Sequence, residues 1–175
     1  KGVFTLLDAC KLLKGQGYVF QCDFVGGETA DMDAERFKHE CEQRGIANCV
    51  TYHGRKYGEE KFPFFRQTDI FVFPTFYNKE CFPLVLLEAM EQSLPCISTF
   101  EGGIADIIDE GKTGFLIPCR EVQPLAERIG LLLKDETLRR RLGKAGREKF
   151  EKEYTLSRFE QNIKRCLEIC LLKKK

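Results

Sequence analysis

Two glutamates near the start of a predicted helix are the residues whose types and spacing could do chemistry. Seven residues separate Glu80 from Glu88, and Pro83 between them suits the first turn of a helix. We therefore expect Glu80 in the preceding loop and Glu88 more than one turn inside the helix. The free N–H groups and the dipole of a helix start favour an anion. A phosphate there, with a carboxylate on each side to accept hydroxyls, could hold a phosphorylated sugar. Solvated helix acids are the alternative interpretation.

The elements that must position these acids alternate between strand and helix patterns. Strands are expected over residues 18–25, 49–52, 69–74, 95–99 and 114–117. Helices are expected over residues 3–13, 31–44, 59–67, 83–92, 104–108, 122–134, 135–150 and 155–172. This alternation implies parallel strands joined by right-handed crossovers. The predicted fold class is α/β, a doubly wound parallel sheet with C-terminal helices.

Two apolar segments carry further expectations. The strand at 69–74 is apolar almost throughout, as in strands that are buried on both faces. The closing helix places five apolar residues on one face, and packing against the core is the preferred interpretation: Leu156, Phe159, Ile163, Leu167 and Leu171. A contact with a membrane surface is the alternative, although Lys173–Lys175 supply fewer cations than a lipid-binding cluster needs.

Composition limits the class of protein. The chain has 175 residues, which suits one domain, and a formal net charge of +1. With an isoelectric point near 7.6, it lacks the basic excess of a nucleic-acid-binding protein. No apolar stretch approaches the length of a membrane span. The nine cysteines include no C-x-x-C pair, so we interpret them as small apolar side chains in a reducing compartment, which predicts a cytoplasmic location.

Four short patterns match part of a functional motif. Each has a structural interpretation or lacks a feature that the motif needs. The 111–113 stretch, Gly-Lys-Thr, lacks the first glycine of a phosphate-binding loop and suits a turn. The 15–17 stretch, Gly-Gln-Gly, precedes a strand, so NAD binding is unsupported. Asp31 and Asp33 match a bare D-x-D metal pattern, but acids at a helix start are the simpler explanation. His39 and His53 have no evident ligand set, and no metal site is predicted.

The stretch from Ile70 to Pro118 resembles the donor-binding domain of GT-B glycosyltransferases, specifically the retaining family 4. The resemblance rests on Glu80 and Glu88 as an E-x7-E motif and on the segments that follow: Ala89-Met90, Leu94-Pro95, Ser98-Thr99, Gly102-Gly103-Ile104, Asp106-Ile107-Ile108 and residues 111–118. Lys1-Gly2, residues 24–27 and residues 52–54 are similar to the ends of the first, second and third strands of that domain. The resemblance thus extends over essentially the whole chain.

The resemblance implies a role for each matching residue. Glu80 would accept hydroxyls of the donor sugar, and Glu88 those of the nucleotide ribose. The backbone N–H groups of Phe82, Leu84 and Val85 would contact the diphosphate. Lys1 would stabilise the diphosphate as a leaving group, and the loop at Gly54 and Arg55 would lie near the base. No metal or other cofactor would be required.

This chain departs from the family pattern in three ways. It has Cys81 and Pro83 where many relatives have glycine, and Pro83 removes one backbone donor. It begins at Lys1, so we expect the domain to lack its first strand and an upstream arginine, leaving a gap in the sheet or forcing the strands to pair differently. The acceptor-binding N-terminal domain is also expected to be absent.

The function implied is transfer of a sugar from a nucleotide diphosphate-sugar to an acceptor hydroxyl, with retention, in polysaccharide or glycan biosynthesis. The alternative is a nucleotide-sugar binding module that is inactive alone because the acceptor domain is missing. A GT-B-like epimerase would need an acid and a base in a cleft, for which the sequence offers no candidates. Since family acceptors are often lipid-linked, peripheral contact with the inner membrane face is a further expectation.

Overall fold

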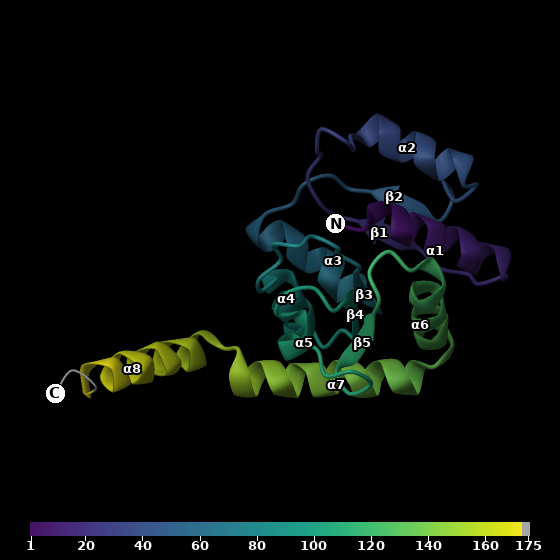
Figure 1. The fold of residues 1–175 in the computed structure, drawn as a ribbon. Coiled ribbons are helices and arrows are strands. Elements are labelled where there is room, and N and C mark those ends of the chain that lie inside the picture. Colours follow the sequence, from purple (N-terminus) through teal and green to yellow (C-terminus); the bar gives the residue numbers. More distant parts are fainter. Residues whose placement is uncertain (173–175) are drawn as a thin grey trace.

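The computed structural model describes residues 1–172. Helices alternate along the chain with short parallel strands (Figure 1). The strands are β1 (Cys22–Phe24), β2 (Val50–Tyr52), β3 (Phe71–Phe73), β4 (Cys96–Thr99) and β5 (Gly114–Ile117). The helices are α1 (Val3–Gly15), α2 (Ala34–Gln43), the 3-10 turn η1 (Gly58–Lys61), α3 (Phe62–Gln67), α4 (Leu84–Glu91), α5 (Ile104–Ile107), α6 (Val122–Lys134), α7 (Glu136–Glu153) and α8 (Leu156–Leu172). The predicted order of elements is confirmed.

The strands form two separate parallel sheets. β1 pairs with β2, in the register Cys22 with Val50, and β3, β4 and β5 form a second sheet in that order. Within residues 1–172, β1 and β3 do not pair with each other. The expected interruption of the sheet is therefore present: β1 and β2 form one sheet, and β3, β4 and β5 form the other.

Helices cover both faces of the three-stranded sheet, as the doubly wound class requires. Ile97 and Ile117 point into one core, which they share with α1, α2, α6 and the two-stranded sheet. Cys96 and Leu116, one residue away on the same strands, point into a second core with α3, α4 and α5. This alternation follows from the two-residue period of a strand. The first core connects the two sheets, chiefly through the packing of α1 against α6.

Three expectations about individual elements need correction. β3 is only half-buried, unlike β4 and β5, and within the described residues it pairs along one edge alone. The strand predicted at 18–25 is three residues long. Helix α4 begins at Leu84, and Pro83 is its extended N-cap residue rather than a residue of its first turn. The proline nonetheless marks where the helix starts.

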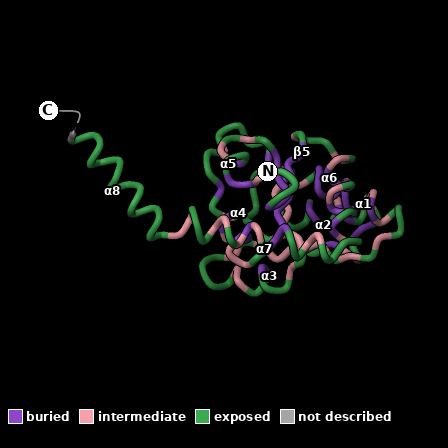
Figure 2. Tube along the Cα trace, turned by 90° about the horizontal axis from the view of Figure 1, so that it is seen from below, coloured by how far each residue is buried: buried purple, intermediate pink, exposed green. Residues whose placement is uncertain are grey.

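The prediction that the last helix packs on the core is wrong. α8 projects away from the rest of the described chain and is exposed over residues 156–171 (Figures 1 and 2). The side chains expected in the core are exposed by 72% at Leu156 and 61% at Leu167. An amphipathic pattern predicts that a face will be covered, but not by which partner. Lys173–Lys175 lie outside the described residues. Among those that are described, no helix is long and apolar enough to span a bilayer.

Candidate functional site

Glu80 lies in the loop after β3, and buried polar groups hold that loop. Thr75, fully buried, donates from Oγ1 to Glu80 Oε2 at 3.5 Å and accepts from the Tyr77 N–H at 3.2 Å. The carbonyl of Thr75 accepts from Thr99 Oγ1 on β4 at 2.6 Å. The Glu80 side chain is only 12% exposed. A buried strand end thus fixes this carboxylate from the side of the three-stranded sheet.

The glycine pair after β4 supports the same loop. Gly102 has φ +53°, and a Cβ atom there would lie 1.5 Å from the carbonyl oxygen of Glu80. Gly103 donates its N–H to the Cys81 carbonyl at 2.8 Å. No side chain could occupy position 102 without moving the backbone of residue 80. These glycines therefore position Glu80.

Lys1 lies against Glu80 and forms an ion pair with it. Its ammonium also lies 4.7 Å from the ring centroid of Tyr77, a cation–π distance. Gly2 allows this approach, because it has φ +82° and a Cβ there would lie 2.0 Å from the Pro74 carbonyl oxygen. The structure therefore brings together the two residues predicted to be catalytic. The Lys1 side chain remains 52% exposed, so it has room to move toward a ligand.

The start of α4 separates Glu80 from Glu88. Leu84 and Val85 are the first two residues of the helix, and the N–H groups at these positions have no intrahelical acceptor. Neither Pro83 nor another side chain caps them. Phe82 and Leu84 are exposed by 42% and 66%, and the Phe82 ring packs edge-on against Tyr154. The predicted diphosphate-contacting segment is therefore open at the surface. Its N–H groups are free to bind an anion.

Glu88 lies in the second turn of α4 and is paired with a lysine that the sequence did not single out. Lys61, the last residue of η1, places its Nζ 2.5 Å from Glu88 Oε1. The other oxygen, Oε2, is buried and has no hydrogen-bond partner among the described residues. An unpaired buried carboxylate oxygen costs roughly 1–3 kcal/mol, and a hydrogen-bond donor that reached this atom would remove that cost.

Gly54 and Arg55 follow β2, at the carboxyl end of the two-stranded sheet. The Gly54 carbonyl accepts from the Gly26 N–H at 3.0 Å, which ties the loops after β1 and β2 together. Arg55 is exposed, lies over Gly27 and stacks on Tyr57, with 5.7 Å from its guanidinium to the ring centroid. The chain then enters η1 and reaches Lys61. The loop predicted near the base is thus connected to Glu88 through Lys61.

Two of the rejected motifs have structural roles. Asp33 caps α2 by accepting the Arg36 N–H at 2.8 Å, as expected for an acid at a helix start. Thr113 is buried in a turn, and its Oγ1 accepts the Asp109 N–H at 2.9 Å. Among residues 1–172, no group of three or more His, Cys, Asp or Glu side chains is placed to hold a metal ion. The expectation that no metal is required stays a prediction.

Two cysteines on the three-stranded side, Cys96 and Cys119, are held as thiols. Cys96 is buried in β4, and desolvation raises the pKa of its thiol to about 12. Burial, followed by the hydrogen bond to Glu101, raises the pKa of Cys119, whose Sγ lies 3.0 Å from Glu101 Oε1. Both remain thiols at neutral pH, and thiols are weak nucleophiles. Three cysteines, at 81, 166 and 170, are exposed, so the interpretation of the cysteines as small apolar side chains, which implies burial, does not fit these three.

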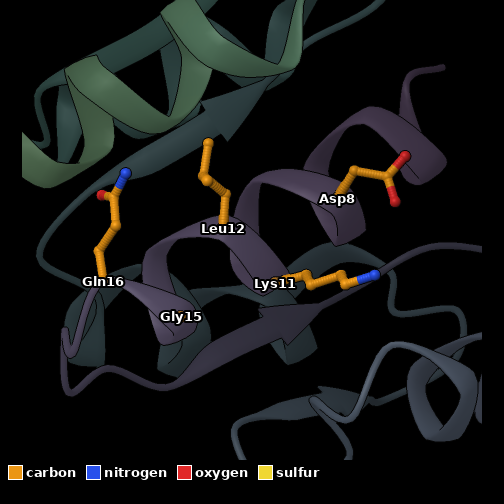
Figure 3. Close-up of a pocket in the computed structure, with 5 residues that line it drawn as sticks. All are labelled: Asp8, Lys11, Leu12, Gly15 and Gln16. Atoms are coloured by element: carbon orange, nitrogen blue, oxygen red, sulfur yellow. The ribbon is translucent and has the colours of Figure 1, made fainter.

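A surface pocket lies on α1, away from these residues. Asp8, Lys11, Leu12, Gly15 and Gln16 line it (Figure 3). Their side chains do not converge on one point, and Asp8 is already paired with Arg44 at 2.7 Å. The pocket therefore lacks the convergent polar groups of a binding site.

Sequence reasoning missed two residues of the site, Thr75 and Lys61. Thr75 had a usable signal, because a polar residue directly after a buried strand lies at the edge where parallel sheets bind ligands. Lys61 had none, since only the tertiary packing of η1 beside α4 brings it to Glu88.

Comparisons with known proteins agree with this architecture. The chain is 27% identical to the capsular polysaccharide biosynthesis glycosyltransferase CapM of Staphylococcus aureus over 155 residues, 89% of this chain and 39% of CapM. Sucrose-phosphate synthase from Thermosynechococcus elongatus superposes with a TM-score of 0.84 at 27% identity, over 99% of this chain and 43% of that one. Anabaena HepE, solved with UDP-glucose, gives a TM-score of 0.84 at 20% identity, over 96% of this chain and 45% of that one.

These likenesses support a GT-B, Rossmann-like fold. The chain spans less than half the length of these three proteins. The model of one family, described as glycosyl transferases group 1, matches residues 1–149, which include every predicted site residue. The chain therefore belongs to the glycosyl transferases group 1 family.

Proposed function

We propose that this chain is the donor-binding domain of a retaining, family 4-like glycosyltransferase that uses a nucleotide diphosphate-sugar. The observation that carries the proposal is the placement of Glu80 and Glu88 on either side of the uncapped start of α4, with Lys1 at Glu80. The relatives support it, since CapM is named for capsular polysaccharide biosynthesis and HepE was solved with UDP-glucose. In the parent protein, an N-terminal domain would bind the acceptor.

The charges at the site suit a departing diphosphate. Negative charge that develops on the β-phosphate would be stabilised by the N–H groups of Leu84 and Val85 and by Lys1. Lys1 now neutralises Glu80, and its exposed side chain can turn to the phosphate when donor enters. Glu80 would then accept hydroxyls of the sugar, while the anomeric carbon takes on oxocarbenium character. These groups stabilise charge without a metal ion.

Substitution of the two acids tests the proposal. Glu88→Ala in the 175-residue chain should weaken binding of a nucleoside diphosphate by about 10- to 150-fold, the effect of losing a charged hydrogen bond of ~1.5–3 kcal/mol. Titration calorimetry with UDP, GDP and ADP measures this effect. Unchanged affinity would refute the ribose role of Glu88. Glu80→Ala should retain nucleotide binding in this chain and abolish sugar transfer in the parent enzyme, and full turnover would refute its role.

The alternative, a binding module that is inactive alone, concerns the same donor site. An assay of released nucleotide distinguishes an inactive binding module from an active enzyme. The 175-residue chain would be incubated with UDP-glucose, GDP-mannose or ADP-glucose. Binding without release supports the inactive module, whereas release with a sugar product supports an active enzyme. The anomeric configuration of that product, determined by NMR, tests retention.

The exposed apolar face of α8 supports a contact with a membrane surface. Its apolar side chains include Phe159 and Ile163, exposed by 60% and 47%. We propose that this helix reaches the membrane surface that presents a lipid-linked acceptor. Cosedimentation with anionic vesicles tests the contact, and Phe159→Ser should reduce it. Failure of the wild-type chain to bind the vesicles would contradict the proposal.

A further inference from the structure

We infer that Lys61 is a positioning residue for Glu88, and that this pair gives the site its preference for a ribose over a deoxyribose. The inference rests on the proposed function, because it assigns a supporting residue to the carboxylate that would bind the nucleotide ribose. Lys61 touches neither reacting atoms nor sugar in this account. It acts through the orientation and charge of Glu88.

The geometry of the pair restricts both side chains. Lys61 Nζ lies 2.5 Å from Glu88 Oε1, and the two side chains are 29% and 32% exposed. A half-buried ion pair with a charged hydrogen bond restricts both side chains more than an exposed pair would. The ammonium therefore limits the carboxylate to those orientations that keep one oxygen on Lys61.

Lys61 leaves one oxygen of Glu88 without a partner in the described part of the chain. Glu88 Oε2 is buried and has no partner among the described residues, although it carries two lone pairs. A hydroxyl that donates to this carboxylate would remove the cost of the unpaired oxygen. Because the terminal torsion of glutamate is broad and the ammonium has three donors, the carboxylate can turn toward a ligand while Lys61 keeps its contact.

The segment that carries Lys61 is held in place by local hydrogen bonds and aromatic packing. η1 is closed by reciprocal bonds between Tyr57 and Glu60, with the Tyr57 N–H 3.2 Å from Glu60 Oε2. Phe64, in the next helix, packs edge-on against His53 at the end of β2, with ring centroids 4.8 Å apart. Phe65 is buried against Phe71 of β3. The backbone at Lys61 is thus held between the two sheets.

η1 connects the loop predicted near the base to the acid predicted at the ribose. Residues 54–57 lead directly into η1, and Lys61 at its end contacts α4. The pair is therefore placed to contact the ribose of a nucleotide, which lies between the base and the diphosphate. A hydroxyl-donating ribose suits the free oxygen, whereas a deoxyribose would leave part of that capacity unused.

The test compares Lys61→Met, Lys61→Arg and the charge-matched control Lys112→Met, which changes an exposed lysine in the turn before β5. Titration calorimetry on the 175-residue chain would use UDP, 2′-deoxy-UDP, 3′-deoxy-UDP and pyrophosphate, with GDP and ADP series in parallel. We expect Lys61→Met to weaken ribonucleotide binding about tenfold and to reduce the preference for ribose by a similar factor. Binding of pyrophosphate should stay unchanged, Lys61→Arg should retain most of the preference, and Lys112→Met should match the wild type.

Three outcomes would overturn the inference. Equal weakening for ribonucleotide, deoxynucleotides and pyrophosphate would make Lys61 a direct phosphate contact. Tighter ribonucleotide binding by Lys61→Met would make the lysine a competitor for Glu88. An unaltered preference for ribose in a folded Lys61→Met variant would leave Glu88 independent of it.

Failure of the proposed function itself looks different. In that case the wild-type chain shows no preference for ribose, and Glu88→Gln changes nothing. Circular dichroism of each variant verifies that it is folded.

Discussion

The acids and the cations of the candidate site come from different regions of the molecule and are held in different ways. Glu80 and Glu88 follow β3, and buried threonines and close glycine packing fix the backbone at Glu80. Lys1 and Lys61 come from segments that precede β3 and reach the acids through their side chains. Lys1, whose side chain is 52% exposed, can leave Glu80 for a ligand without rebuilding the fold, whereas Lys61 is held beside Glu88 by the packing of its segment. The comparison predicts that the loop after β3 tolerates change least.

The largest effect should follow Gly102→Ala. The new Cβ would meet the Glu80 carbonyl at 1.5 Å in a left-handed backbone, so the free energy of unfolding should fall by about 2–5 kcal/mol. Urea denaturation measures the change. Gly15→Ala at the end of α1, where a Cβ meets nothing within 4 Å, is the control and should be neutral or slightly stabilising. Equal tolerance at both positions would remove the basis for calling the Glu80 loop fixed.

Thr75→Val should have the next largest effect. The substitution keeps the shape of the buried side chain but leaves the Tyr77 N–H without its acceptor, at a cost of about 1–3 kcal/mol. Thermal or urea unfolding gives the value. Thr51→Val, on an exposed position of β2, loses only an exposed hydrogen bond from Gln21 and should change stability by less than about 0.5 kcal/mol. A larger loss at Thr51 than at Thr75 would contradict the prediction that the loop after β3 tolerates change least.

Asp33→Ala should lower the free energy of unfolding moderately, through the helix that packs beside the two-stranded sheet. Losing the cap of α2 should cost about 1 kcal/mol, while Asp31→Ala should be nearly neutral because only its backbone carbonyl is used, by Arg36. Nucleotide binding should survive both changes. Loss of binding in both variants, without loss of stability, would show that the two acids form a D-x-D site after all.

Ser93→Gly should produce the smallest effect, and a favourable one. Ser93 has φ +59° and an exposed side chain, so glycine should raise the free energy of unfolding by up to about 1 kcal/mol. Arg120→Gly relieves a similar φ of +64° but loses the stacking of its guanidinium on Phe76 at 4.4 Å, so its net effect should be close to zero. Denaturation curves compare the two. A loss at Ser93 would show that its backbone is not strained.

How much of this could be predicted depended on the range of the interaction. Hydrophobic periodicity predicted β5 at its observed bounds and the start of α4 within one residue of Pro83, because both follow from local pattern and turn chemistry. The pairing of Lys61 with Glu88 could not be predicted, since it joins residues far apart in the chain through packing. The exposure of Leu167 on α8 could not be predicted either, because an amphipathic helix has the same sequence pattern whatever covers it.

The central claim is that a nucleoside diphosphate binds at the start of α4, between the two acids. The most direct measurement is the map of backbone amide shifts of the ¹⁵N-labelled chain during titration with whichever of UDP, GDP or ADP binds most tightly. We predict the largest shifts at Phe82, Leu84 and Val85, with smaller shifts at Gly54 and Arg55. Shifts centred on the α1 pocket at Lys11 and Gln16, or no shift with any of the three nucleotides at millimolar concentration, would contradict the account.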